Sequence, residues 1–322
     1  MNSLRLKIYF GLLLVYILLL IYLYVPLPEK VVDDVGSIKF ISCTQTNCAV
    51  FLTELIQASQ ETKCVLYDLD EDSLFQVFDE KSVPVLLFEE NYEEDFSEFI
   101  QPVKSLGLMH HKFCIFDESY ILTGTWNPTE RGTYYNDNYV IFIQSSALAK
   151  EYLKEYERVE SFKQATSRGL KVSLSDMDIR TCMTRQENCE NLIIKEIEKA
   201  EETISVLAFT FTSKPVAEAL IEATLRGVEV LVIFEKTRIT QYCVIHRFEG
   251  SLVQSYLDGN KYVMHEKMFL IDNSTAIVGS YNPTKGAQEK NDENILIIQG
   301  DVNFMNKANE EFGRILEVAV LR

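Results

Sequence analysis

Two stretches of the sequence decide the fold, and they are near copies of each other: MHHKFCIFD (109–117) with GTWNPT (124–129), and MHEKMFLID (264–272) with GSYNPT (279–284). The second pair follows the first at a constant distance of 155 residues. Asn136-Asp137 recurs at the same distance as Asn291-Asp292. A repeat held over so long a distance indicates a duplicated structural unit. We therefore expect two similar halves in one chain.

Each copy carries the pattern H-x-K-x4-D-x6-G-[ST]-x-N. Residues two apart share one face of a strand, so His110 should project with Lys112, and His265 with Lys267. An imidazole can act as nucleophile or general acid near neutral pH, and a neighbouring ammonium can hold phosphate oxygens. Two such strands side by side would place two imidazoles on opposite sides of one phosphorus atom.

The doubled pattern resembles the signature of the phospholipase D superfamily, over roughly residues 38–305. This resemblance implies in-line displacement at a phosphodiester through a phosphohistidine, with neither a metal ion nor another cofactor. By the family's precedent His110 is the nucleophile and His265 the acid, although the symmetry of the sequence leaves the reverse assignment open. The motif aspartates, Asp117 and Asp272, would have supporting roles. Side chains after each glycine would donate hydrogen bonds to the phosphate oxygens: Thr125, Asn127, Ser280 and Asn282.

One position departs from the family pattern. Family members often carry a glutamate shortly after each motif that hydrogen-bonds an active histidine. Glu293 fits this role, whereas the first copy has Asn138 at the matching place. An amide can orient an imidazole but does not stabilise its charged form, so we expect the two histidines to differ in electrostatic support. We expect His111, which lies between motif positions, and His246 to be structural.

The pattern of apolar residues predicts an α/β fold made of two similar α-β-α layered repeats related by a pseudo-twofold axis. We place the repeats at residues 36–146 and 171–322, joined by a connecting helix and turn at 147–170. In the second half, helical spacing at 190–201 and 215–226 alternates with β-rich segments at 204–211 and 228–234. The first-half counterparts are a helix at 49–58 and strands at 64–69 and 83–88.

The amino-terminal segment IYFGLLLVYILLLIYLYV, residues 8–25, has no charged or amide side chain. As a helix it would be about 27 Å long, close to the hydrocarbon thickness of a bilayer. Arg5 and Lys7 precede it and acidic residues follow, which favours a cytoplasmic amino terminus and a body on the extracytoplasmic side. A cleaved signal peptide is the alternative, but its apolar run would be shorter. We expect residues 1–35 to form a single-pass transmembrane anchor and linker.

The net charge limits the class of substrate. The chain has 31 Lys and Arg against 48 Asp and Glu, a formal charge of −17, with the acidic stretch EENYEEDFSEF at 89–99. This field repels a polyanion, so we expect a membrane phospholipid as partner and a nucleic acid less readily. A metal-independent endonuclease and a cardiolipin synthase-like transferase are the alternative enzymes, and a binding module with a vestigial site is the non-enzymatic one. Because both motifs lie in one chain, a monomer should be active.

The seven cysteines contain no CxxC pair, which argues against a structural zinc site. We expect most of them to be unpaired, buried small side chains. One or two disulfides are possible in an oxidising compartment, with Cys43 and Cys48 near each other in the sequence.

Overall fold

Two β-sheets organise the chain. The computed structural model describes residues 31–93, 96–163 and 169–322, and residues 31–322 form one unit. The predicted membrane segment at 8–25 lies outside the described residues. Within the described ranges, every helix is too short or too polar to cross a bilayer.

In spatial order, the first sheet consists of β2 (Ser37–Ser42), β8 (Tyr139–Gln144), β7 (Tyr120–Gly124), β6 (Lys112–Phe116), β3 (Thr62–Leu66), β4 (Val85–Phe88) and β5 (Ile100–Val103). The second sheet consists of β1 (Val31–Asp34), β9 (Lys171–Leu174), β10 (Met177–Met183), β16 (Asn294–Gln299), β15 (Thr275–Gly279), β14 (Lys267–Ile271), β11 (Thr203–Ala208), β12 (Glu229–Phe234), β13 (Gln254–Leu257) and β17 (Val320–Leu321).

The two sheets share a strand order. The run β10-β16-β15-β14-β11-β12-β13 of the second sheet matches β2-β8-β7-β6-β3-β4-β5 of the first. In each run, the strand that begins with the motif lysine pairs antiparallel with an upstream strand, β6 with β3 and β14 with β11. The mixed α/β class is confirmed, while the twofold axis stays a prediction. One boundary changes, because Val31–Asp34, expected within the linker, forms β1 and pairs in parallel with β9.

Two helices pack in the core that the sheets share, and the other long helices cover the outer face of one sheet or the other. The helices are α2 (Cys48–Ala58), α3 (Asp72–Glu80), α4 (Glu130–Tyr134), α5 (Ser146–Glu160), α6 (Cys189–Lys199), α7 (Lys214–Leu225), α8 (Lys285–Glu289) and α9 (Val302–Leu316). Short 3-10 turns are η1 (Glu89–Asn91), η2 (Lys236–Arg238) and η3 (Val244–Arg247). The helices expected at 49–58, 190–201 and 215–226 are α2, α6 and α7.

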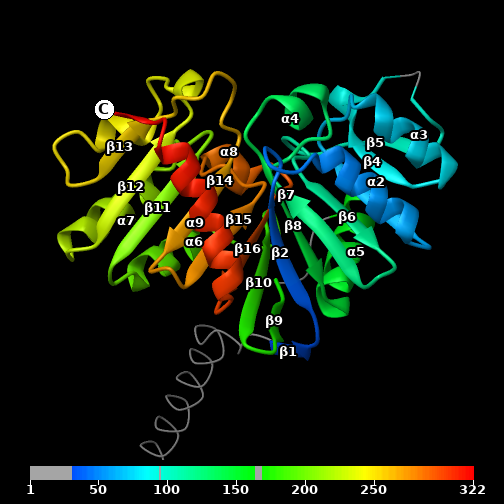
Figure 1. Cartoon of the computed structure of the whole chain (residues 1–322), viewed down its shortest axis with the longest axis horizontal. Coiled ribbons are helices and arrows are strands. Elements are labelled where there is room, and N and C mark those ends of the chain that lie inside the picture. The colour runs from blue at the N-terminus through cyan, green and yellow to red at the C-terminus, as the bar shows by residue number, and fades with distance from the viewer. Residues whose placement is uncertain (1–30, 94–95, 164–168) are drawn as a thin grey trace, which may run out of the picture. The chain divides into compact units, whose positions relative to one another are not determined.

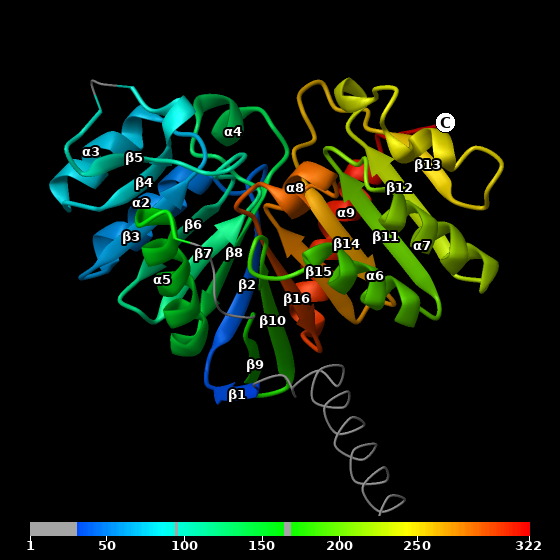
Figure 2. The same ribbon diagram turned by 180° about the vertical axis from the view of Figure 1, so that it is seen from behind.

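The two halves are held by one shared apolar core rather than by two separate ones. Buried residues of both sheets, α5 and α9 form a single cluster, whereas α2 and α3 pack in a second cluster and α6 and α7 in a third. Figure 1 shows α9, from the second half, beside β2 of the first, and the two elements are in contact. Figure 2 shows α5, the expected connecting helix, against β6 and β7. The phenol of Tyr139 in β8 also donates to the carbonyl of Lys267 in β14, at 2.6 Å.

The glycine of each motif is required by a close approach of two strands. Gly124 and Gly279 have φ angles of 154° and 141°. A Cβ atom at these positions would lie 2.4 Å from the carbonyl oxygen of Tyr139 and 2.2 Å from that of Asn294. Only glycine fits such a contact without displacing the neighbouring strand.

The expectation for the cysteines is wrong. Disulfides join Cys43 to Cys48, Cys64 to Cys114 and Cys182 to Cys189, and Cys243 is the free, buried thiol. The first and third bonds tie the start of α2 to the end of β2 and the start of α6 to the end of β10, so they occupy matching places. The nearness of Cys43 to Cys48 in the sequence agrees with the first bond, whereas Cys64 and Cys114, 50 residues apart, meet only once β3 pairs with β6.

We expect a thiol reagent to find one reactive thiol per chain after unfolding without reductant, and seven after reduction, because six cysteines are paired. The protein should be prepared from an oxidising compartment. The variant Cys243→Ser should show none before reduction. Three or more thiols in the unreduced wild-type chain would contradict the pairing.

Candidate active site

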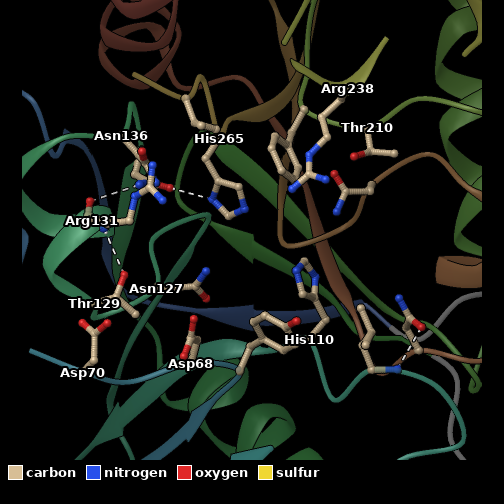
Figure 3. Close-up of a pocket in the computed structure, with 18 of the residues that line it drawn as sticks. Asp68, Asp70, His110, Asn127, Thr129, Arg131, Asn136, Thr210, Arg238 and His265 are labelled. Atoms are coloured by element: carbon tan, nitrogen blue, oxygen red, sulfur yellow. Dashed lines mark hydrogen bonds between the residues drawn. The ribbon is translucent and has the colours of Figure 1, made fainter. Parts of the chain in front are cut away.

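The two motifs open onto one cavity of about 540 Å3. It lies at the sheet edges where β6 and β14 begin and where the chain leaves β3 and β11. Both predicted histidines, His110 and His265, line it, together with Asn127 and Asn282. Figure 3 shows the two imidazole rings projecting into the same space. The structure therefore brings these four predicted residues together from positions far apart in the sequence.

His110 is held by a carboxylate. Its Nδ1 lies 2.7 Å from Oε2 of Glu293, which also accepts a hydrogen bond from the Ser280 hydroxyl at 2.7 Å. The ring packs edge-to-face on Tyr67, with centroids 4.8 Å apart. Because the carboxylate fixes Nδ1 as the protonated nitrogen, Nε2 is left with its lone pair free for the cavity.

His265 is held by an amide in the corresponding way. Its Nδ1 lies 2.9 Å from Oδ1 of Asn138, which accepts from the Thr125 hydroxyl at 3.1 Å. The ring packs edge-to-face on Phe209, with centroids 4.6 Å apart. The predicted difference between a carboxylate and an amide partner is present, and each partner comes from the other half of the chain.

The backbone makes the same exchange between halves. The amide of His110 donates to the carbonyl of Asp292 at 2.9 Å, and that of His265 donates to the carbonyl of Asp137 at 3.0 Å. Isolated β-bridges join Met109 to Asp292 and Asp137 to Met264. The segment after each motif therefore borders the histidine of the other motif.

The lysines lie behind the histidines rather than on the cavity wall. Lys112 and Lys267 are buried, and their Nζ atoms donate to the carbonyls of His110 and His265 at 2.7 and 2.6 Å. Each ammonium is 4.8 Å from the ring centroid of Tyr67 or Phe209. In this arrangement the lysines add positive potential from behind the rings, and their direct hold on phosphate oxygens stays a prediction.

Burial and these charges keep the histidines neutral. Burial, together with the charges of Lys112 and Lys267, lowers the pKa of His110 to about 4, although Glu293 acts to raise it. Burial, Lys267 and Lys112 hold the pKa of His265 well below its ordinary value. Burial also lowers the pKa of Lys112 to about 7. An anion entering the cavity would raise all of these pKa values, since it favours each charged form.

The remaining predicted polar residues divide into two groups. Asn127 and Asn282 line the cavity and each has a buried Oδ1 without a hydrogen-bond partner, while Nδ2 is the atom of each amide that can donate to a phosphate oxygen. Thr125 and Ser280 are fully buried and bind Asn138 and Glu293 instead of facing the cavity. They orient the groups that hold the histidines, which differs from the predicted contact with phosphate.

The motif aspartates lie at the opposite end of their strands, outside the cavity. Asp117 accepts from the amides of Gln60 and Glu61, both at 2.8 Å. Asp272 accepts from the amides of Glu201, Glu202 and Thr203 at 2.8 to 2.9 Å. Although burial raises the pKa of Asp272, these backbone donors hold it below its ordinary value. Both aspartates fasten a β-hairpin to the start of the neighbouring strand, β3 or β11, which is a supporting position away from the cavity.

A second layer of charge supports each histidine strand. His111, expected to be structural, is fully buried, with Nε2 2.7 Å from Glu155, and Glu155 binds Arg158, which binds Asp292. At the matching place Glu266 faces Glu311, which binds Arg314, which binds Asp137. Neither carboxyl oxygen of Glu266 receives a hydrogen bond. Burial raises the pKa of Glu266 well above its ordinary value, and Glu311 and Asp137 raise it further while Arg314 lowers it.

Several residues that line the cavity lie outside the predicted set of site residues: Tyr67, Asp68, Asp70, Arg131, Phe209, Thr210 and Arg238. Most of them follow β3 and β11, where the motif spacing gives no signal. The strand expected at 64–69 ends at Leu66, which frees the next residues to form the wall. Described residues of the acidic stretch at 89–99 do not line the cavity, and Asp68 and Asp70 supply its negative charge.

No group of three or more His, Cys, Asp or Glu that could hold a metal ion occurs among the described residues.

A family model described as "Cardiolipin synthase, PLD-like domain" matches residues 54–160 and 193–316, together more than half of the chain. The two matched segments contain both motifs and both histidine partners.

Relatives of the chain include a phospholipase D of Rickettsia prowazekii, 28% identical over 191 residues, which covers 59% of this chain and 86% of the relative. A mitochondrial cardiolipin hydrolase of Xenopus laevis is 26% identical over 164 residues, which covers 45% of this chain and 78% of the relative. The solved structure of a phosphatidylserine synthase from Haemophilus influenzae superposes with a TM-score of 0.69 at 12% identity, over 88% of this chain and 87% of that chain. This last likeness concerns the fold.

The variant Glu266→Gln should change how stability depends on pH. The folded wild type holds a proton on Glu266 that the unfolded chain releases above a pH of about 4.3, so the free energy of unfolding falls as pH rises toward the raised pKa. Glutamine removes this loss. Its stability relative to wild type should therefore rise between pH 5 and pH 9, as measured by urea unfolding.

The matched control is Glu310→Gln, at a surface glutamate paired with Lys307, which should leave the pH dependence of stability as it is in the wild type. Parallel stability curves for wild type and Glu266→Gln would show that Glu266 is ionised in the folded protein.

Proposed function

Because the chain belongs to the family of PLD-like domains, we propose that it is a membrane-anchored phospholipase D-type phosphodiesterase that hydrolyses glycerophospholipids without a metal ion. The observation that carries the proposal is the pair of neutral imidazoles in one cavity, each with Nδ1 engaged and Nε2 free. One ring of such a pair can attack phosphorus, and the other can protonate the leaving oxygen once the bound anion has caused it to take up a proton at Nε2.

In the first step, Nε2 of His110 attacks phosphorus and forms a P–N bond. The P–O bond to the leaving alcohol breaks, and the leaving oxygen takes the proton from Nε2 of His265, which the bound anion has first caused to be protonated. Glu293 stabilises the positive charge that develops on His110, a charge-assisted hydrogen bond worth roughly 1.5–3 kcal/mol. This favours His110 over His265 as the nucleophile, because Asn138 has no charge to offer.

In the second step, His265 takes a proton from water as the water oxygen attacks phosphorus. The P–N bond breaks and its electron pair returns to His110. Lys112 and Lys267 lie behind the rings and offset the phosphate charge, while the amides of Asn127 and Asn282 bind its oxygens. These fixed groups supply the charge stabilisation that a metal ion would otherwise provide.

Four observations support a phospholipid as substrate and an extracytoplasmic place for the body. The apolar segment at 8–25 would tether the body to a bilayer, and the net charge of −17 repels nucleic acid. Asp68 and Asp70 on the cavity wall would repel neighbouring phosphates of a polynucleotide. Three disulfides fit an oxidising compartment and so support an extracytoplasmic body. A metal-independent endonuclease and a cardiolipin synthase-like transferase are the alternative activities, and a monomer should suffice for each.

We expect the full chain in detergent, with EDTA present, to release phosphatidate from mixed glycerophospholipid vesicles. His110→Ala should abolish this release, and His265→Ala should lower kcat by about 10²–10⁴-fold. The control is His246→Ala, at an exposed histidine outside the cavity, which should match wild type. Cleavage of single-stranded DNA without phosphatidate release would replace the proposal with an endonuclease.

We also expect Glu293→Gln to lower kcat by about 10- to 100-fold with little change in KM, because it removes the charge that supports a cationic His110. The labelled phosphohistidine intermediate, trapped by acid quenching, should map to residue 110. An equal loss in Glu289→Gln, at a residue paired with Lys285 on the surface, would point to a general charge effect instead.

A further inference from the structure

The walls of the cavity differ in charge at positions that match between the halves. Leu66 pairs with Lys112 and Ala208 pairs with Lys267, so Tyr67 matches Phe209 and Asp68 matches Thr210. The next residues confirm this register, because the amides of Glu71 and Ser213 donate to the carbonyls of Pro128 and Pro283. A carboxylate in the first half therefore stands where the second half has a neutral hydroxyl.

The two halves also differ in charge after the next strand of each sheet, β4 or β12. The 3-10 turn η1 after β4 has the sequence Glu-Glu-Asn, whereas η2 after β12 has Lys-Thr-Arg. Lys236 is paired with Asp258. On the cavity wall itself the first half supplies Asp68 and Asp70 together with Arg131, whereas the second half supplies Arg238 and no carboxylate.

Arg131 of the first half and Arg238 of the second are the arginines that line the cavity, and Arg238 is the one that lies against the ring beside His265. Its guanidinium lies 4.6 Å from the ring centroid of Phe209, and this ring packs against His265. Figure 3 shows Arg238 beside His265, across the cavity from Asp68 and Asp70. Among the described residues no carboxylate forms an ion pair with Arg238, so its five N–H donors are available to a ligand.

We propose that Arg238 binds an anionic group, a carboxylate or a second phosphate, on the ester substituent that lies on the His265 side of the scissile phosphate. Asp68 repels the same group from the His110 side, so the two walls fix the direction in which the diester binds. This proposal rests on the proposed function, in which the substituent beside His265 is the leaving alcohol. The substrate class is then a phosphodiester of glycerolipid whose leaving alcohol is itself anionic.

The test measures binding with the full chain carrying His110→Asn, so that affinity is read without turnover. The probes are dihexanoyl phosphatidyl esters of 1-propanol, 3-aminopropanol, 3-hydroxypropionate and 3-hydroxypropyl phosphate. Both anionic esters should bind about 10-fold or more tightly than the propanol ester, and the ammonium ester most weakly. Adding Arg238→Gln should remove the preference and leave the propanol ester unchanged, whereas Arg238→Lys should keep part of it.

The matched control is Arg247→Gln, at an arginine paired with Glu218 outside the cavity, which should change nothing. A preference for only one of the anionic esters would identify the group as carboxylate or phosphate. Equal binding of all four esters, or an equal loss for all four in Arg238→Gln, would overturn the proposal. Turnover of the propanol ester by the wild-type chain tests the proposed function separately, because it does not depend on Arg238.

Discussion

Two hydrogen bonds that cross between the halves are the constraint on which the site depends. Glu293 of the second half holds His110, and Asn138 of the first half holds His265. Each bond fixes a tautomer and leaves Nε2 facing the cavity. Because the backbone amides of both histidines also donate across the same boundary, neither imidazole can be placed correctly unless both halves are docked.

The shared core makes this docking stable. Phe40 of β2 packs on Tyr139 and on Phe304 of α9, with ring centroids 5.1 and 5.7 Å apart. Burial that excludes water from this core also lowers the dielectric around the histidines and lysines. The same packing that joins the halves therefore keeps His110 and His265 neutral, which suits one of them to attack and the other to take up a proton when an anion arrives.

The sequence alone located the chemistry but not its support. A doubled motif and strand alternation are enough to bring His110, His265, Asn127 and Asn282 to one cavity. The depth of Lys112 and Lys267 depends on the rings of Tyr67 and Phe209, which come from a distant part of each half. The partner exchange is invisible in the spacing, because Glu293 and Asn138 each follow their own motif. Asp117 and Asp272 occur at a fixed place in each motif because they bind the backbone at the end of a hairpin. The spacing alone cannot distinguish such a structural role from a catalytic one.

Because each histidine is held by a residue of the other half, neither copy of the motif can function without the other. A substitution at Glu293 alters His110 in the other half, and one at Asn138 alters His265 in the same way. A compensating substitution would therefore lie in the half that does not carry the first one. A fragment that carries a single copy would retain an imidazole but would lack the side chain that aims it. The two copies therefore differ in the charged side chains that they present to the cavity, while the pair of oriented histidines needs both copies to form.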